Sequence, residues 1–177
     1  MGRQGGVDSR NLSANVRWRQ TKPARLYRRW DVRVGGNRSW NFGGLNRPGE
    51  NFVSLNWTLP NFMNMSGELF QQPRAFDDRL TRGGPVMGTP SSSGWSFDIE
   101  SPDGRRNRWQ LNVDHQRSEN NGWNQEIGLE FGFQPSDRLE ISLEPNWSRD
   151  ANARQYITSE PTASSPTYNT RYVFGRV

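Results

Sequence analysis

The 177-residue chain has no cysteine, one histidine, one lysine and only 31% hydrophobic residues. Without cysteine it cannot form disulfides, thiol nucleophiles or cysteine-bound zinc sites. With His115 as its single histidine, it cannot build a metal site from several histidines. No segment approaches the roughly 20 apolar residues that a membrane-spanning helix requires. The first residues also lack the apolar stretch of a signal peptide, so an exported protein of this sequence is expected to be incomplete at its N-terminus.

The residues that are abundant point away from disorder. Aromatic residues make up 12% of the chain and include 8 tryptophans, which is unlike a disordered segment. Of the 23 basic residues, 22 are arginine, and the net charge is +5. Arginine favours planar, multidentate contacts with carboxylates and phosphates. The composition therefore predicts a structure that uses aromatic residues without a large buried core.

Apolar and polar residues alternate with a period of two along most of the chain. For example, Val53, Leu55 and Trp57 alternate with Ser54 and Asn56. Successive side chains of a strand point to opposite faces, so each such segment has one apolar and one polar face. We predict an all-β protein with an antiparallel up-and-down meander of about nine strands. The expected strands are residues 11–20, 26–35, 51–59, 62–70, 94–101, 107–116, 124–134, 138–148 and 168–177, with a long loop at 71–93.

The pattern predicts that short connections alternate with long ones along this meander. The short ones carry the Pro, Gly, Asn or Asp residues that tight turns select. Sorting of short turns to one end of a sheet and long loops to the other is typical of outer-membrane β-barrels, which have an apolar outside and a polar lumen. Several tryptophans fall near expected strand ends, as interfacial aromatic girdles require; they are Trp18, Trp95, Trp109, Trp123 and Trp147. The alternative is a soluble β-sandwich or barrel with these tryptophans in its core.

The polar faces carry charged residues that we expect to point into the lumen. They are Asp98, Glu100, Arg108, Asp114, Glu126, Glu130, Glu140 and Glu144. Same-side carboxylate pairs among them are compatible with the two carboxylates of a glycosidase, but a ladder of paired, hydrated charges is the favoured interpretation. The sequence shows no nucleophile motif, metal-ligand pattern or phosphate-binding loop. We therefore predict no catalytic residues, no metal and no cofactor, and we expect His115 to be an exposed residue at the rim.

Two possible partners follow from the basic character of the chain. Arginine next to tryptophan, as in Arg17-Trp18-Arg19, is compatible with single-stranded nucleic acid. Acidic residues are interleaved on the same faces, so no continuous basic stripe forms and nucleic acid is disfavoured. Outer-membrane lipid or anionic lipopolysaccharide fits the arginines equally well and is the preferred partner.

The most distinctive local sequence is Thr81-Arg82-Gly83-Gly84-Pro85-Val86-Met87 in the long loop. Adjacent glycines followed by proline predict a sharp, rigid bend, and Arg82 is expected to anchor it on a lumen carboxylate. The string resembles a signature of an uncharacterised bacterial family that joins an N-terminal carbohydrate-binding, family-9-like domain to a C-terminal outer-membrane β-barrel. Similar stretches are Thr21-Lys22-Pro23, Trp40-Asn41-Phe42-Gly43-Gly44, Asp103-Gly104-Arg105, Gln134-Pro135-Ser136, Gln155-Tyr156-Ile157 and Arg171-Tyr172-Val173-Phe174.

The resemblance implies a barrel fragment in the outer membrane of a bacterial cell. On this basis the chain is expected to be a membrane anchor or pore for a protein whose carbohydrate-binding domain is missing here, and not an enzyme in its own right. The resemblance implies a structural role for Arg82, Gly83, Gly84 and Pro85 only. An open meander cannot satisfy its edges in lipid, so further strands are expected. The alternative function is a soluble β-sandwich or barrel that binds glycans through exposed tryptophans.

Overall fold

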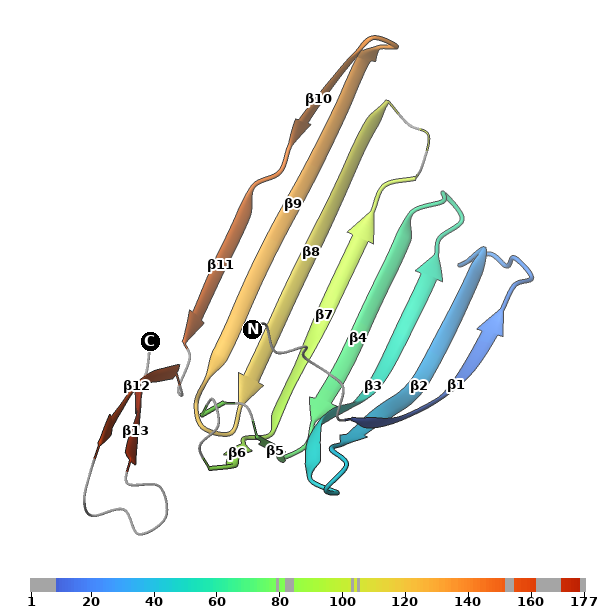
Figure 1. Ribbon diagram of the computed structural model, residues 1–177. Helices are drawn as coiled ribbons and strands as arrows, with labels where there is room; N and C mark the ends of the chain where they lie inside the picture. The colour runs from blue at the N-terminus through green and yellow to red at the C-terminus, as the bar shows by residue number, and fades with distance from the viewer. Residues whose placement is uncertain are drawn as a thin grey trace.

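A computed structural model describes residues 9–78, 80–81, 85–102, 104, 106–151, 155–161 and 170–175. Their secondary structure is all-β, as the alternation predicted, and most of the strands form one antiparallel meander (Figure 1). The strands are β1 (Arg10–Gln20), β2 (Arg29–Trp40), β3 (Asn46–Thr58), β4 (Asn64–Gln72), β5 (Ala75–Asp77), β6 (Met87–Thr89), β7 (Ser92–Glu100), β8 (Asn107–Ser118), β9 (Trp123–Ser136), β10 (Leu139–Leu143), β11 (Asn146–Ala151), β12 (Gln155–Pro161) and β13 (Thr170–Gly175).

The main sheet has nine strands in the order β1-β2-β3-β4-β7-β8-β9, with β10 and β11 both paired to β9. Because β10 and β11 follow each other along the same edge of β9, the nine strands occupy eight positions. The sheet is open, and β1 lies at one margin while β10 and β11 lie at the other (Figure 1). Two small hairpins, β5–β6 and β12–β13, stand outside this sheet.

Several strands are longer than the sequence pattern indicated. Residues 36–40 and 46–50, which lie between the expected strands 26–35 and 51–59, continue β2 and β3, and the connection is only Asn41–Leu45. The backbone bends there through Gly44, which has a φ of 82°. Residues 35–40 do not alternate, but backbone pairing extends through them with a register shift between Asn37 and Ser39.

The predicted sorting of short turns and long loops is wrong. The connection between β1 and β2 covers residues 21–28 and is longer than the one between β2 and β3 at the opposite end. The connection between β8 and β9 is the four-residue segment Glu119–Gly122, which turns at Asn121 with a φ of 64°. Among the connections of the main sheet, the one between β4 and β7 is the longest, and it contains the β5–β6 hairpin.

The C-terminal part also differs from the expected strands. The strand predicted at 138–148 is divided into β10 and β11, because Pro145 has no N–H to donate to the ladder. Strand β12 lies in residues expected to form a loop, and it pairs with β13.

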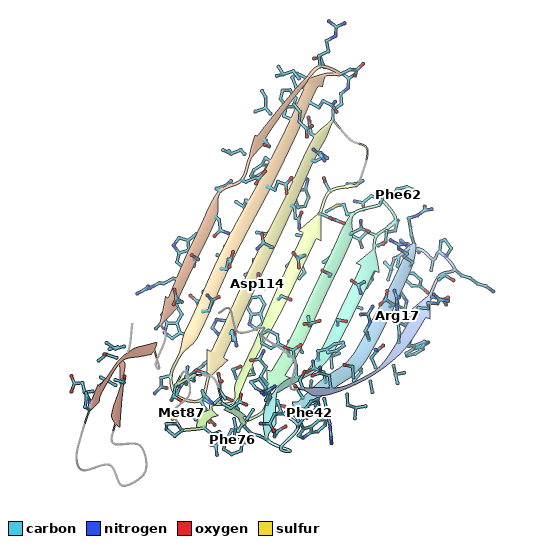
Figure 2. The ribbon with its side chains drawn as sticks, viewed as in Figure 1. Arg17, Phe42, Phe62, Phe76, Met87 and Asp114 are labelled. Carbon is cyan, nitrogen blue, oxygen red and sulfur yellow. The ribbon has the colours of Figure 1, made fainter. Side chains whose placement is uncertain are left out.

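The described residues contain almost no buried apolar core. Ala75 is the one described hydrophobic residue that is buried, while large apolar side chains remain exposed along every strand of the main sheet. Phe42, Phe76 and Met87 gather at the end of the sheet where β5 and β6 lie, and Phe62 lies at the other end (Figure 2). The fold is therefore a sheet with two chemically distinct faces, not two layers around a core.

Candidate functional site

The polar face of the main sheet is organised in rows that cross all eight strand positions. The pairing partners place one residue of each strand position in each central row, and the rows alternate between the two faces. One polar row contains Arg19, Asp31, Asn56, Ser66, Asp98, Asn112, Gly128 and Asn146. The next polar row contains Arg17, Arg33, Ser54, Glu68, Ser96, Asp114, Glu126 and Ser148. Charge and hydrogen-bonding capacity therefore run uninterrupted across the face.

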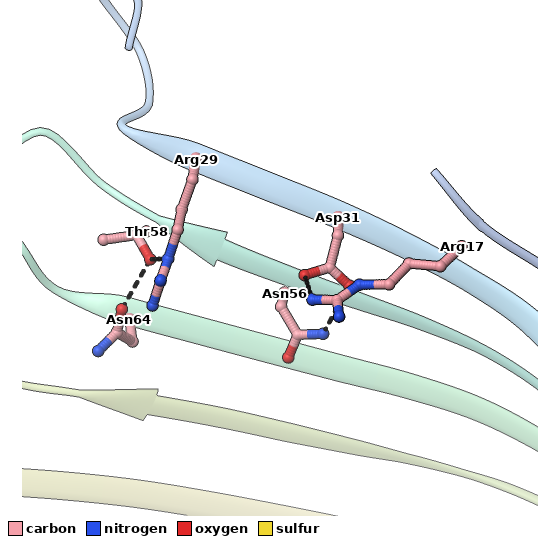
Figure 3. A network of polar contacts seen from close by, with 6 residues as sticks. All are labelled: Arg17, Arg29, Asp31, Asn56, Thr58 and Asn64. Atoms are coloured by element: carbon pink, nitrogen blue, oxygen red, sulfur yellow. Dashed lines mark hydrogen bonds and ion pairs between the residues drawn. The ribbon is translucent and has the colours of Figure 1, made fainter. Parts of the chain in front are cut away.

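Neighbouring strands are joined across this face by an arginine–carboxylate network (Figure 3). Arg17 Nη2 donates to Asp31 Oδ1 at 2.6 Å, and Asn56 Nδ2 donates to Asp31 Oδ2 at 3.2 Å. Asp31 is only 8% exposed. A carboxylate removed from water needs such charged and amide donors to offset the loss of hydration. The network thus ties β1, β2 and β3 together on the polar side.

A second chain of hydrogen bonds continues toward β7. Arg29 Nε donates to Thr58 Oγ1 at 3.1 Å, and the Thr58 hydroxyl donates to Asn64 Oδ1 at 2.8 Å (Figure 3). Asn64 Nδ2 in turn donates to Glu100 Oε1 at 2.8 Å. Four successive strand positions, from β2 to β7, are thereby linked by side chains alone.

These networks border a hollow on the polar face with a volume of about 630 Å3. Its wall is built by six neighbouring strands, so the polar side of the sheet is concave there. The charged residues of the wall are Arg17, Arg19, Arg29, Asp31, Arg33, Asp98 and Glu100. Both signs of charge line this hollow, which suits water and small polar solutes and disfavours an apolar ligand.

The charged residues expected to face a lumen share this polar face. The register places Asp98, Glu100, Arg108, Asp114, Glu126 and Glu130 there. Glu140 lies beside them and forms an ion pair with Arg108, while Glu144 follows the end of β10 and is exposed. The structure therefore brings the predicted set, apart from Glu144, to one side, although it does not enclose that side.

The same-side carboxylates are held by neutral donors from adjacent strands. Ser66 Oγ lies 3.5 Å from Asp98 Oδ2, and Asn146 Nδ2 donates to Glu126 Oε1 at 2.7 Å. Each of these bonds satisfies part of the acceptor capacity of a carboxylate. The arrangement is a polar ladder that crosses neighbouring strands.

His115 does not lie at an exposed rim as expected. It is a half-buried residue of β8 on the apolar face, paired across the sheet with Trp95. The two ring centroids are 6.2 Å apart, and the buried His115 Nδ1 has no hydrogen-bond partner among the described residues. Its alternation with the apolar residues of β8 could have indicated this position.

Two phenylalanines on the polar face were missed by the sequence reasoning. Phe52 and Phe70 are cross-strand partners, and their rings lie over Gly35 and Gly94. A Cβ built at Gly94 would be 2.6 Å from Phe70 Cζ, and one built at Gly35 would be 3.0 Å from Phe52 Cζ. Glycine at these two positions therefore provides the space that the aromatic rings occupy.

The distinctive string in the long loop is described only in part. Arg82, Gly83 and Gly84 lie outside the described residues, so the expected contact of Arg82 with a carboxylate also lies outside them. Thr81, which precedes them, is buried, and its hydroxyl donates to the carbonyl of Pro85 at 2.8 Å. Thr81 and Pro85, on either side of these residues, are thus held together.

The long loop is fixed to the sheet by two ion pairs. Arg47 Nη2 donates to Asp78 Oδ2 at 2.8 Å, and Arg74 Nε donates to both carboxylate oxygens of Glu119 at 2.9 Å. The bond from Arg47 holds the pKa of Asp78 below its usual range, with a smaller contribution from Asn41. The bond from Arg74 likewise lowers the pKa of Glu119.

Acidification is expected to release this loop. A carboxyl with a lowered pKa contributes stability while it is ionised, and this contribution is lost as the pH falls below about 4. We predict that the protein has a higher urea midpoint than its Asp78→Asn/Glu119→Gln variant at pH 7, and that this difference is smaller at pH 3. Tryptophan fluorescence in urea at each pH measures it. A difference of the same size at both pH values would contradict the assignment.

Comparison of the chain with protein-family models, with curated proteins and with solved structures gave no match. Among the described residues, no helix is long and apolar enough to cross a membrane. The same part of the chain holds no group of three or more His, Asp or Glu side chains placed to bind a metal ion.

Proposed function

We propose that this chain is a segment of a transmembrane β-barrel in the bacterial outer membrane, where it serves as an anchor or a pore. Its apolar face contacts lipid, and its polar face lines a hydrated interior. Lipid or lipopolysaccharide is then its partner, and it is not an enzyme. A link to a carbohydrate-binding domain rests solely on the sequence resemblance.

The observation that carries the proposal is an apolar row that spans the whole sheet and is open to the surroundings. This row contains Trp18, Val32, Leu55, Gly67, Phe97, Val113, Ile127 and Trp147. Trp18 is 72% exposed and Trp147 50% exposed, at the two ends of the row. Soluble monomers rarely expose contiguous apolar patches larger than a few hundred Å2, whereas a lipid-facing surface requires one.

The strands of the main sheet are long enough to cross a lipid bilayer. A tilted transmembrane strand needs about 9–11 residues, and the full-length strands of the main sheet run from 9 residues in β4 and β7 to 14 in β9. A soluble sandwich would bury the apolar residues of its strands, but Leu129, Phe131, Ile141 and Leu143 are between 37% and 64% exposed. No second described sheet packs against them.

The polar face supports the same proposal. Side chains in a barrel interior must be hydrated or paired, and here arginines, carboxylates and amides bond across neighbouring strands. In the alternative function, a soluble glycan-binding protein, exposed tryptophans such as Trp18 would stack on sugar rings. That alternative requires a molecule that stays dissolved without lipid.

Flotation with lipid vesicles tests the proposal. The chain is refolded from urea in the presence of phosphatidylcholine vesicles, washed at high salt and centrifuged in a sucrose gradient. We expect the protein to float with the vesicles, and a sample refolded without vesicles to aggregate. A folded protein that stays dissolved at the bottom of the gradient would contradict the membrane function and favour the soluble alternative.

A further inference from the structure

The outer edge of β1 is regular and unprotected. All eleven residues of β1 pair with β2 without a register shift, and no described strand pairs with the other edge. Edge strands of soluble sheets are usually blunted by proline, lysine or bulges. β1 has no proline, lysine or bulge, and its charged residues are the arginines Arg10, Arg17 and Arg19. Its outer backbone N–H and C=O groups therefore form a template for another strand, with side chains that favour an acidic partner.

The opposite margin of the sheet presents a second open edge, formed by β10 and β11. Strand direction alternates at each of the eight positions, so β1 runs antiparallel to β10 and β11. A β1 strand placed beside β10 would therefore continue the antiparallel order. Its apolar and polar residues would also continue the two faces of the sheet.

The apolar residues shift along the strand direction from one margin to the other. On β1 they run from Leu12 to Trp18, and the cross-strand partners place Trp18 level with Ile127 of β9. The apolar residues of β9 continue well past Ile127, and Leu143 and Ile141 of β10 pair with Phe131 and Phe133. Such a stagger is expected in a barrel, where strands tilt against the axis. The apolar residues of β1 therefore continue this stagger when β1 lies beside β10, and not when it lies beside β11.

Charge complementarity supports the same alignment. In antiparallel pairing, three registers place Trp18 opposite an apolar residue of β10, namely Leu139, Ile141 or Leu143. The first register sets Arg17 opposite Glu140, the second sets Arg19 opposite Glu140, and the third sets Arg17 opposite Glu144. Opposite charges on directly facing residues stabilise strand pairs. Each apolar match thus also gives an arginine–glutamate match.

We propose that the β1 edge of one copy pairs with the β10 edge of a second copy of this chain. The two edges lie at opposite margins of one copy and face away from each other across the sheet (Figure 1). The contact is head-to-tail, and such contacts close into rings when the rotation between copies permits. The pairing itself uses backbone groups, whereas the choice of β10 as the partner edge rests on the proposed barrel and its stagger.

Cysteine cross-linking tests the pairing directly, because the chain has no cysteine of its own. One variant carries Asn15→Cys on β1 and another carries Ser142→Cys on β10; both positions are exposed on the polar face. The two variants are mixed, refolded in detergent or vesicles, and treated with a short flexible bis-maleimide. We expect a covalent dimer in the mixture and several-fold less in either variant alone.

Two further variants decide the outcome. The Ser13→Cys/Asn37→Cys variant joins direct partners on β1 and β2 and must cross-link within one copy, which verifies folding and reactivity. The Asn15→Cys/Ser142→Cys variant is diluted with excess cysteine-free protein. If two copies pair, the covalent dimer of this variant disappears when cysteine-free protein is in excess.

Two results would overturn the proposal. One is a cross-link within a single copy that survives the excess of cysteine-free protein. The other is the absence of any cross-link while the Ser13→Cys/Asn37→Cys control reacts. Flotation is scored separately, so a failure of the membrane function remains distinguishable.

Discussion

Replacing Val53 with arginine is expected to destabilise the membrane-inserted protein by about 2 to 4 kcal/mol, the cost of an arginine at the bilayer midplane on the lipid face of a barrel. Val53 lies on the apolar face near the middle of β3, between Val34 of β2 and Leu69 of β4. Its neighbours offer no carboxylate on that face to pair with a new guanidinium.

The matched control is Ser54→Arg, one residue along the same strand. Ser54 lies on the polar face between Arg33 and Glu68, where an arginine can reach water and a carboxylate. We expect a change of about 1 kcal/mol or less there. Urea titration of both variants in vesicles, followed by tryptophan fluorescence, measures the difference. Equal effects of the two substitutions would show that the two faces meet the same surroundings.

Gly94→Val is expected to destabilise the sheet by about 3 kcal/mol or more, beyond the usual cost of overpacking a core. A Cβ at Gly94 would lie 2.4 Å from the carbonyl oxygen of His115 and 2.6 Å from Phe70 Cζ. The Phe70 ring can rotate away, but the His115 carbonyl belongs to the neighbouring strand β8. Relief of the contact therefore requires the strands to separate.

Gly67→Ala is the matched control for Gly94. Gly67 lies in β4, and the nearest atom to a Cβ built there is the Ser96 carbonyl oxygen at 3.7 Å, an ordinary contact. We expect this variant to unfold within about 0.5 kcal/mol of the parent protein. Phe70→Leu combined with Gly94→Val should recover only part of the loss. Full stability of Gly94→Val alone would show that the ring does not occupy this space.

The strands were predicted correctly where apolar and polar residues alternate strictly. Their ends were predicted wrongly where this alternation stops. The pattern around Val53 and Leu55 identified the middle of β3 because each apolar residue there faces the same side. Residues 46–49 continue β3 without such a pattern, since backbone hydrogen bonds extend a strand whatever its side chains are. The break at Pro145 was overlooked although proline cannot donate to the ladder.

The polar face was predicted in composition but not in its contacts. Alternation alone put Asp98 and Glu100 on one side of a strand. The bond between Arg17 and Asp31, and the position of Phe70 over Gly94, depend on which residues of two strands face each other. Register is fixed by turns and cross-strand packing, which a single sequence does not reveal. The position of a phenylalanine ring over a glycine can therefore be recognised only when the cross-strand partners of both residues are known.

Quenching of tryptophan fluorescence by brominated lipid tests the central claim most directly. The register places all eight tryptophans on the apolar face: Trp18, Trp30, Trp40, Trp57, Trp95, Trp109, Trp123 and Trp147. The protein is refolded into vesicles of phosphatidylcholine with or without bromine near the middle of the acyl chains. A lipid-facing apolar face predicts a strong loss of emission in the brominated vesicles. Equal emission in both kinds of vesicle, from protein shown to be folded, would contradict the account.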